Sequence, residues 1–136
     1  MKGEIMERFT VKTPDRTSMI DITREVQNIV SKSAIESGTC LIFVPHTTAA
    51  VTINENADPD VESDIIMELN KIIPFQDHYR HMEGNSAAHI KASLVGESET
   101  VIIDKKRLQL VTWQGIFFCE FDGPRRREVW IKLIKT

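Results

Sequence analysis

The sequence lacks long hydrophobic runs. Its wholly apolar stretches are short, such as Leu41 to Val44 and Ile116 to Cys119, whereas a membrane-spanning helix needs roughly 20 apolar residues. The opening residues, Met1 to Glu4, contain no apolar segment of the kind found in a signal peptide. These absences predict a soluble, cytoplasmic protein.

Cysteine and excess positive charge are also scarce. Cys40 and Cys119 each lie in an apolar, β-rich stretch, which predicts buried reduced thiols and argues against a disulfide framework or a cysteine-based metal cluster. The 17 basic residues are outnumbered by 20 acidic ones, so the net charge is −3. That balance gives no support to a nucleic acid or an anionic membrane as a partner.

The chain contains enough apolar sequence for one core. Of its 136 residues 41% are hydrophobic, and no internal repeat, low-complexity tract or linker rich in proline, glycine and serine divides it. A chain of this length buries roughly two thirds of its unfolded surface. We therefore expect a single domain over residues 1–136.

Apolar periodicity outlines the first elements. Residues 5–11 alternate between apolar and polar side chains, which predicts a half-buried strand, and the polar residues 13–18 predict a turn. Thr23 is expected to cap a helix whose apolar residues follow helical spacing. Gly38 is expected to end that helix as its left-handed C-terminal residue.

The middle of the chain combines buried strands with a second helix. The run from Cys40 to Pro45 is typical of a strand buried on both faces, and another strand is expected around residues 51–53. Asp58 followed by proline predicts a helix that begins there and ends before Pro74.

The remainder predicts a loop, a short helix and a block of strands. Residues 75–85 are polar and aromatic without periodicity, and residues 86–94 predict a helix ended by Gly96. Turns are expected at residues 105–106 and 123–124. The strands between them are expected at residues 99–104, 108–113, 116–121 and 128–134. Because strands dominate, the class is α+β with a largely antiparallel sheet, curved into a sandwich or barrel.

Four histidines lie at or beside predicted strand ends and loops: His46, His78, His81 and His89. Three neutral imidazoles that converge on one point form a standard zinc site with an open fourth position. The spacing of these histidines neither requires nor forbids such convergence. From the residues alone, dispersed or hydrogen-bonded histidines are the favoured alternative to a shared metal site.

Carboxylate and amide groups concentrate where a predicted strand ends and a helix begins. Asp58 is most simply the helix cap, whereas Asn54 and Glu55 have no equally plain structural task. A carboxylate beside an apolar wall can have its pKa raised toward neutrality, as acid or base chemistry requires. Glu55 is thus a candidate acid or base, although most such carboxylates are simply solvated.

Polar residues also bracket the apolar strand at residues 116–121. Gln114 precedes it, and Glu120 interrupts it, so Glu120 either points outward or is buried and paired with an arginine. Three arginines, residues 125–127, follow a Gly-Pro turn and suit either a phosphate or a solvated or intersubunit role. With Lys91 they would form a patch sized for one small phosphorylated metabolite.

The three arginines are not equivalent in sequence. Arg125 directly follows Gly123-Pro124, so we expect the turn to aim its side chain into a pocket. Strand alternation sends Arg126 and Arg127 to opposite faces. The loss of Arg125 is therefore expected to weaken phosphate binding, and the loss of Arg127 to weaken it much less.

These residues together resemble the YjbQ family, an uncharacterised protein family also labelled secondary thiamine-phosphate synthase. The segments that carry the resemblance are Phe43–Val61, Tyr79, His81–Ser86, His89–Leu94, Thr112–Ile116 and Glu120–Arg125. Val111 and Lys106 stand where the family usually has glycine, and Ala87 where aspartate is frequent. The first two leave the local backbone geometry open, because side chains other than glycine disfavour a positive φ.

The resemblance implies a YjbQ-like fold with about three helices, assembled as a homotrimer. Four aromatic side chains agree with an assembly, being more than a small sheet readily covers: Trp113, Phe117, Phe118 and Trp130.

The resemblance also implies one polar pocket that holds the candidate residues. In it His46, His81 and His89 would bind a divalent metal, zinc or magnesium. Lys91 and Arg125 would bind phosphate. The candidate catalytic residues are Asn54, Glu55, Gln114 and Glu120. His78 lies outside the family motifs.

Three functions compete for such a pocket. The first is a thiamine-phosphate synthase-like transferase that joins a pyrimidine diphosphate to a thiazole phosphate with release of diphosphate, which requires that the leaving group be held and the resulting cation be shielded. The second is a metal-dependent hydrolase or phosphoryl-transfer enzyme. The third is a non-catalytic trimeric module that binds a phosphorylated metabolite.

Overall fold

The computed structural model describes residues 3–136 of the chain. Eight strands and three helices are interspersed along these residues. The strands are β1 (Glu4–Lys12), β2 (Ser18–Asp21), β3 (Gly38–Phe43), β4 (Ala49–Glu55), β5 (Ser98–Asp104), β6 (Arg107–Leu108), β7 (Gln114–Glu120) and β8 (Arg126–Lys135). The helices are α1 (Thr23–Lys32), α2 (Pro59–Ile72) and α3 (Ser86–Val95).

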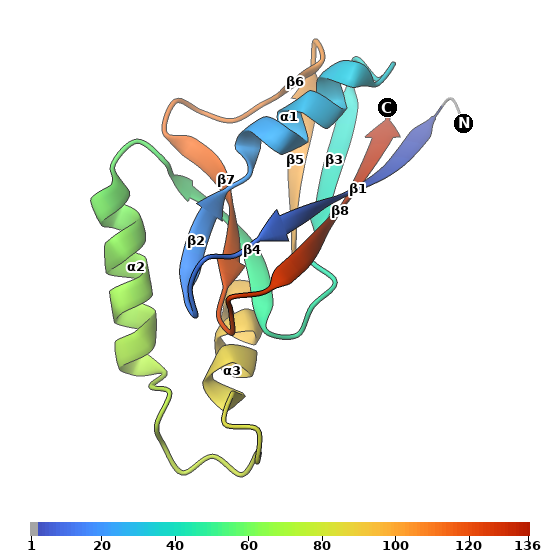
Figure 1. Ribbon diagram of the computed structural model, residues 1–136. Coiled ribbons are helices and arrows are strands. Elements are labelled where there is room, and N and C mark those ends of the chain that lie inside the picture. Colours follow the sequence, from blue (N-terminus) through green and yellow to red (C-terminus); the bar gives the residue numbers. More distant parts are fainter. Residues whose placement is uncertain (1–2) are drawn as a thin grey trace.

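The strands form two antiparallel sheets. The larger has the order β1-β8-β3-β5-β6 and the smaller the order β2-β7-β4. Figure 1 shows α1 across the larger sheet, α2 standing beside the smaller one, and α3 below β4. The expected class, an α+β fold with a curved antiparallel sheet and three helices, is confirmed.

The main core lies between the two sheets and α1. Val26 and Val30 of α1 are fully buried there, because their spacing places both side chains on one face of the helix. The strand residues packed with them include Cys40, Ile42, Val51, Val101, Ile116, Phe118, Val129, Ile131 and Leu133. Burial of these apolar side chains is the main force that holds α1 on the sheets.

A second, smaller core lies between β7 and α3. Ala88 and Ala92 are small enough to let α3 approach the sheet closely, where they meet Phe117, Cys119 and Phe121. Since Phe118 faces the main core, β7 is covered on both of its faces. Both cysteines are buried free thiols, as predicted, and burial raises the pKa of each to about 12.

The expectation that β3 would be buried on both faces is wrong. Cys40 and Ile42 are buried, but Leu41 and Phe43, which alternate with them and face the other side of the larger sheet, are only partly covered. Strand β7 has the doubly buried character instead, with every residue after Gln114 buried.

The helix ends follow the sequence signals in two of three cases. Asp58 caps α2 by accepting a 2.9 Å hydrogen bond from the amide of Asp60, and α3 ends at Gly96, which has a φ of 102°. For α1 the prediction is wrong, because Thr23 is the first helical residue and Asp21 accepts from both its amide and its hydroxyl. Helix α1 also ends at Lys32, well before Gly38.

Two strand assignments also differ from expectation. Ser18 begins the short strand β2 instead of closing a turn. Strand β6 ends at Leu108 instead of continuing to residue 113, and Trp113 is 60% exposed. Lys106 adopts a φ of 63° at the position of the family glycine.

The aromatic argument for an assembly is corrected in part. Phe117 and Phe118 are covered within one chain, so they need no neighbouring subunit. Trp113 remains exposed and Trp130 is half-buried. Of the helices within residues 3–136, none has both the length and the apolar character needed to cross a membrane.

Gly38 provides a direct test of the sheet packing. A Cβ at this position would lie 2.0 Å from the carbonyl oxygen of Ile134 on β8, so we expect Gly38→Ala to lower the free energy of unfolding by about 1–3 kcal/mol or more. Gly3→Ala, with no atom within 4 Å of its added Cβ, should change it by less than about 0.5 kcal/mol. Urea denaturation measures both, and an equal effect would contradict the close approach of β3 and β8.

Candidate functional site

A buried ion pair joins the ends of β7 and β8. Glu120 and Arg127 are almost completely buried. The Arg127 Nε donates to Glu120 Oε1 over 2.8 Å, and its Nη2 donates to Oε2, so the contact is bidentate. Of the two orientations considered for Glu120, the structure therefore has the buried and arginine-paired one.

Hydrogen bonds from neighbouring segments complete this ion pair. Glu120 also accepts from the Thr13 hydroxyl and the Asp122 amide, each over 2.9 Å. Arg127 Nη2 donates to the Thr48 hydroxyl over 2.8 Å. The pair thereby ties together the segment after β1, the β3–β4 loop and the residues that follow β7.

The surroundings of Glu120 keep it ionised. Burial by itself raises the pKa of Glu120, but the hydrogen bonds from Arg127, Asp122 and Thr13 together hold the pKa below its ordinary value. A carboxylate with both oxygens occupied and no exposed surface is suited to holding the fold. The catalytic role expected for Glu120 therefore finds no support in its placement.

A cleft of ≈ 670 Å³ lies beside this ion pair, and we call it the histidine cleft. Three segments form its walls: the β3–β4 connection, the start of α3 with the loop before it, and the β7–β8 connection. Its lining residues include His46, Thr47, Thr48, His81, Glu83, Asn85, His89, Glu97 and Arg125. The three motif histidines thus share one cleft, as the sequence resemblance implied.

The β7–β8 connection presents Arg125 to the cleft in a fixed orientation. Its Nε donates to the Asp122 carbonyl and its Nη2 to Asp122 Oδ2, both over 2.8 Å. Asp122 Oδ2 also accepts from Asn85 Nδ2 over 2.9 Å, so one carboxylate links Arg125 to the start of α3. Half of the Arg125 side chain remains exposed. Arg126 is exposed and Arg127 is buried, so these two neighbours do face opposite sides, as expected.

Asn85 adds an unusual polar group to the cleft wall. Its Oδ1 is buried and has no hydrogen-bond partner among residues 3–136. Its Nδ2 faces the Asp122 carboxylate, which can only accept, so the amide cannot be reversed to relieve Oδ1. A buried acceptor that stays unpaired costs about 1–3 kcal/mol.

The three histidines, as placed, do not form a metal site. The rings of His81 and His89 lie edge to face with centroids 5.6 Å apart, but His46 Nε2 accepts a 2.9 Å hydrogen bond from the Glu128 amide. Within the described residues no group of three or more histidine, cysteine, aspartate or glutamate side chains is arranged to hold a metal ion. Within one chain the three imidazoles are therefore not arranged to bind the expected ion together.

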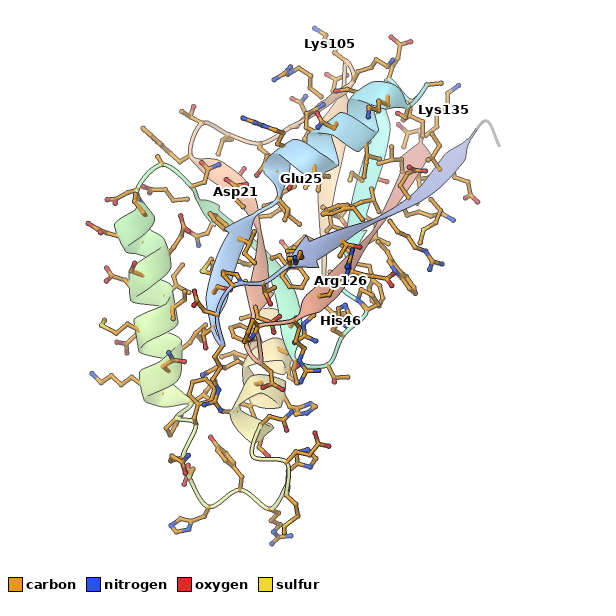
Figure 2. All side chains as sticks on the ribbon, in the orientation of Figure 1. Asp21, Glu25, His46, Lys105, Arg126 and Lys135 are labelled. Carbon is orange, nitrogen blue, oxygen red and sulfur yellow. The ribbon has the colours of Figure 1, made fainter. Side chains whose placement is uncertain are left out.

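Three candidate catalytic residues lie at the opposite end of the smaller sheet. The β4–β7 ladder begins at Ala49 opposite Glu120 and ends at Glu55 opposite Gln114, which at about 3.3 Å per residue is a separation of roughly 20 Å. Asn54 adjoins Glu55 and shares this far end. Asn56, which follows Glu55, donates a side-chain hydrogen bond to Asp21. Figure 2 shows Asp21 well apart from His46. Within one chain the expected single pocket is therefore divided.

Lys91 does not reach the histidine cleft either. It is fully buried, donates to Asn70 Oδ1 of α2, and lies 3.7 Å from the centroid of the Phe75 ring. Burial and the nearby Arg16 lower its pKa to about 8. Arg16 stacks on the same ring, so Lys91 helps to fix the loop after α2, and it is not among the residues that line the histidine cleft.

Several residues of the site were not singled out from the sequence. Thr13 and Thr48 support the ion pair, and Asp122 and Asn85 orient Arg125. The sequence signal that could have located this network was the charge pattern. A glutamate within an apolar strand and an inward-facing arginine on the next strand are suitable partners for a buried ion pair. Nothing in the linear spacing identified Thr13, which is 107 residues from Glu120.

Comparison with known proteins agrees with this fold and these motifs. The chain belongs to the family described as UPF0047 protein YjbQ-like, whose family model matches residues 7–136. It is 52% identical over 131 residues to the UPF0047 protein YugU of Bacillus subtilis, which covers 96% of this chain and 99% of YugU. The family resemblance inferred from the sequence motifs is thus confirmed.

Solved structures show the same architecture. A crystal structure of an uncharacterised YjbQ/UPF0047 family protein from Clostridium acetobutylicum has a TM-score of 0.93 at 52% identity, covering 94% of this chain and 99% of that chain. A YbjQ-like protein of unknown function from Sulfolobus solfataricus has a TM-score of 0.94 at 32% identity over 98% of both chains.

The ion pair leads to a prediction about stability. Glu120→Gln leaves Arg127 buried without a neutralising carboxylate, so we expect the free energy of unfolding to fall by about 3–5 kcal/mol. Replacing both partners, as Glu120→Leu with Arg127→Met, should recover part of this loss because no charge then stays buried. The exposed neighbour provides the control, and Arg126→Ala should have an effect within about 0.5 kcal/mol.

The same pair has a pH signature. Because the folded state lowers the pKa of Glu120, its stabilisation is complete above the ordinary value of 4.5 and is lost as pH falls through the lower folded-state pKa. Denaturant titrations from pH 7 downward should show a steeper acid loss in the wild type than in Glu120→Gln. Parallel curves would contradict the assignment.

Proposed function

We propose that the histidine cleft binds a small phosphorylated metabolite through its phosphate group. The observation that carries this proposal is Arg125, a half-exposed guanidinium that Asp122 orients at the cleft wall while the adjacent Arg127 is neutralised by Glu120. A pre-oriented arginine fork matches phosphate oxygens and loses little side-chain entropy on binding. The cleft adds three imidazoles and the hydroxyls of Thr47 and Thr48, all of which can donate hydrogen bonds to an anion.

The three consecutive arginines, residues 125–127, differ in exposure and position, so substitutions among them test the anion site. We expect Arg125→Ala to weaken pyrophosphate binding by about 1.5 to 3 kcal/mol, the scale of a charge-assisted hydrogen bond. Arg126→Ala is the matched control, since Arg126 is exposed and does not line the cleft. Arg127 is unsuited as a control, because its loss would break the buried ion pair.

Calorimetric titration of the three proteins with pyrophosphate measures this difference. A large loss confined to Arg125→Ala supports a specific anion site. Equal losses in both variants would indicate a diffuse basic patch, and no loss in either would remove phosphate recognition from the cleft.

Catalysis on the bound phosphate compound is a second candidate function. His81 and His89 are in contact beside the proposed phosphate position, and imidazole is suited to proton transfer near neutral pH. This arrangement would serve a hydrolase or phosphoryl-transfer enzyme. In a thiamine-phosphate synthase-like transferase Arg125 would hold the diphosphate, and Glu83 and Glu97 of the cleft would replace Glu55 and Glu120 as the shielding carboxylates.

Turnover distinguishes these candidates from a binding module. Product formation by the purified protein, lost in His81→Ala with the fold intact, would favour an enzyme. Tight ligand binding without product would favour the module.

A homotrimer remains part of the proposal. It is supported by α2, none of whose residues is fully buried although the helix has an apolar face. Exposed apolar side chains include Met67 and Ile72 of this helix and Leu94 of α3. We expect light scattering to give three times the mass of one chain, and a stable monomer at micromolar concentration would contradict the assembly.

A further inference from the structure

The hydrogen bond to His46 determines where its imidazole proton lies. The backbone amide of Glu128 donates to His46 Nε2 over 2.9 Å. An amide N–H cannot accept a hydrogen bond, so Nε2 must contribute its lone pair and cannot carry a proton. In the neutral ring the proton is then on Nδ1.

The Nδ1 atom of His46 has no partner within the described chain. It makes no hydrogen bond to any of residues 3–136 and is not fully buried, so it remains accessible. His46 lines the histidine cleft together with Arg125. The Nδ1–H group is therefore available to a molecule in the cleft.

The local charges favour the neutral ring. Burial and the positive charge of Arg127 lower the pKa of His46, against smaller opposing effects of the Glu120 and Glu128 carboxylate charges. At neutral pH the ring consequently offers one N–H donor and one occupied acceptor.

We propose that His46 is a neutral hydrogen-bond donor to the bound oxyanion, acting through Nδ1–H, and not a metal ligand or a general base. The inference rests on the proposed function, because the oxyanion is the phosphate of the ligand. Arg125 and His46 stand on different walls of the cleft, so the ligand class is one whose oxygens accept from both sides, a phosphate monoester or a diphosphate. A metal at Nε2 would have to displace the Glu128 amide, and a base at Nδ1 would find a proton already in place.

Two substitutions separate the two nitrogen positions. The longer glutamine side chain of His46→Gln can place its oxygen near the former Nε2 and keep the Glu128 contact, but it removes the donor at Nδ1. The shorter asparagine of His46→Asn can place its NH₂ near the former Nδ1 and keep the donor, but it loses the Glu128 contact. We expect pyrophosphate affinity to fall about tenfold in His46→Gln and by less than about threefold in His46→Asn, on the scale of one neutral hydrogen bond.

Nitrogen-15 NMR of the imidazole groups reads the tautomer independently of ligand affinity. The His46 signals are identified by their absence in His46→Gln. We expect a protonated Nδ1 and an unprotonated Nε2 at neutral pH, unchanged when zinc is added. An Nε2–H tautomer, an imidazolium ring, a zinc-dependent change at His46, or equal affinity losses in the two variants would each overturn the proposal.

The two proposals fail in different ways. If His46 shows the wrong tautomer while pyrophosphate binding still depends on Arg125, the role of His46 is overturned and the anion cleft stands. If the wild type does not bind pyrophosphate, the anion cleft is overturned, and the donor role of His46 with it, even if the tautomer is as expected.

Discussion

The buried ion pair between Glu120 and Arg127 is the interaction on which the rest of the site depends. Two charges removed from water are tolerated only when their remaining hydrogen-bonding capacity is satisfied. Thr13, Thr48 and the Asp122 amide provide those bonds. Each belongs to a different connection of the fold. The ion pair therefore ties the β3–β4 and β7–β8 connections, which form two walls of the histidine cleft, to each other and to the β1–β2 connection.

This arrangement gives neighbouring residues separate tasks. Arg127 is neutralised inside the protein, while Arg125, two residues earlier, keeps an exposed guanidinium at the cleft. The amide of Arg125 donates to the Thr13 hydroxyl, which itself donates to Glu120. The backbone that carries the ligand-facing arginine is thus anchored on the same network that buries its neighbour, and His46 is held by the amide directly after Arg127.

The sequence predicted the architecture better than the site. Two local signals, Asp58 before Pro59 and Gly96 after α3, depend on nearby backbone and predicted helix ends correctly, whereas Thr23 did not cap α1. Gly38 resembled a helix end but is required by the close approach of Ile134, a contact 96 residues away that no local pattern contains. For the same reason, shared motif membership could not reveal that Glu55 and Gln114 lie at the far end of the β4–β7 ladder from the histidines.

On the proposed function, the anion binds in the histidine cleft and not at the opposite end of the smaller sheet. Backbone amide chemical shifts, recorded while pyrophosphate is added to isotopically labelled protein, test this most directly because they locate binding without any substitution. If the anion binds in the histidine cleft, we expect the changes to concentrate at residues 43–48, 81–89 and 122–128. Changes centred on residues 54–56 and 113–115, or none at saturating pyrophosphate, would contradict it.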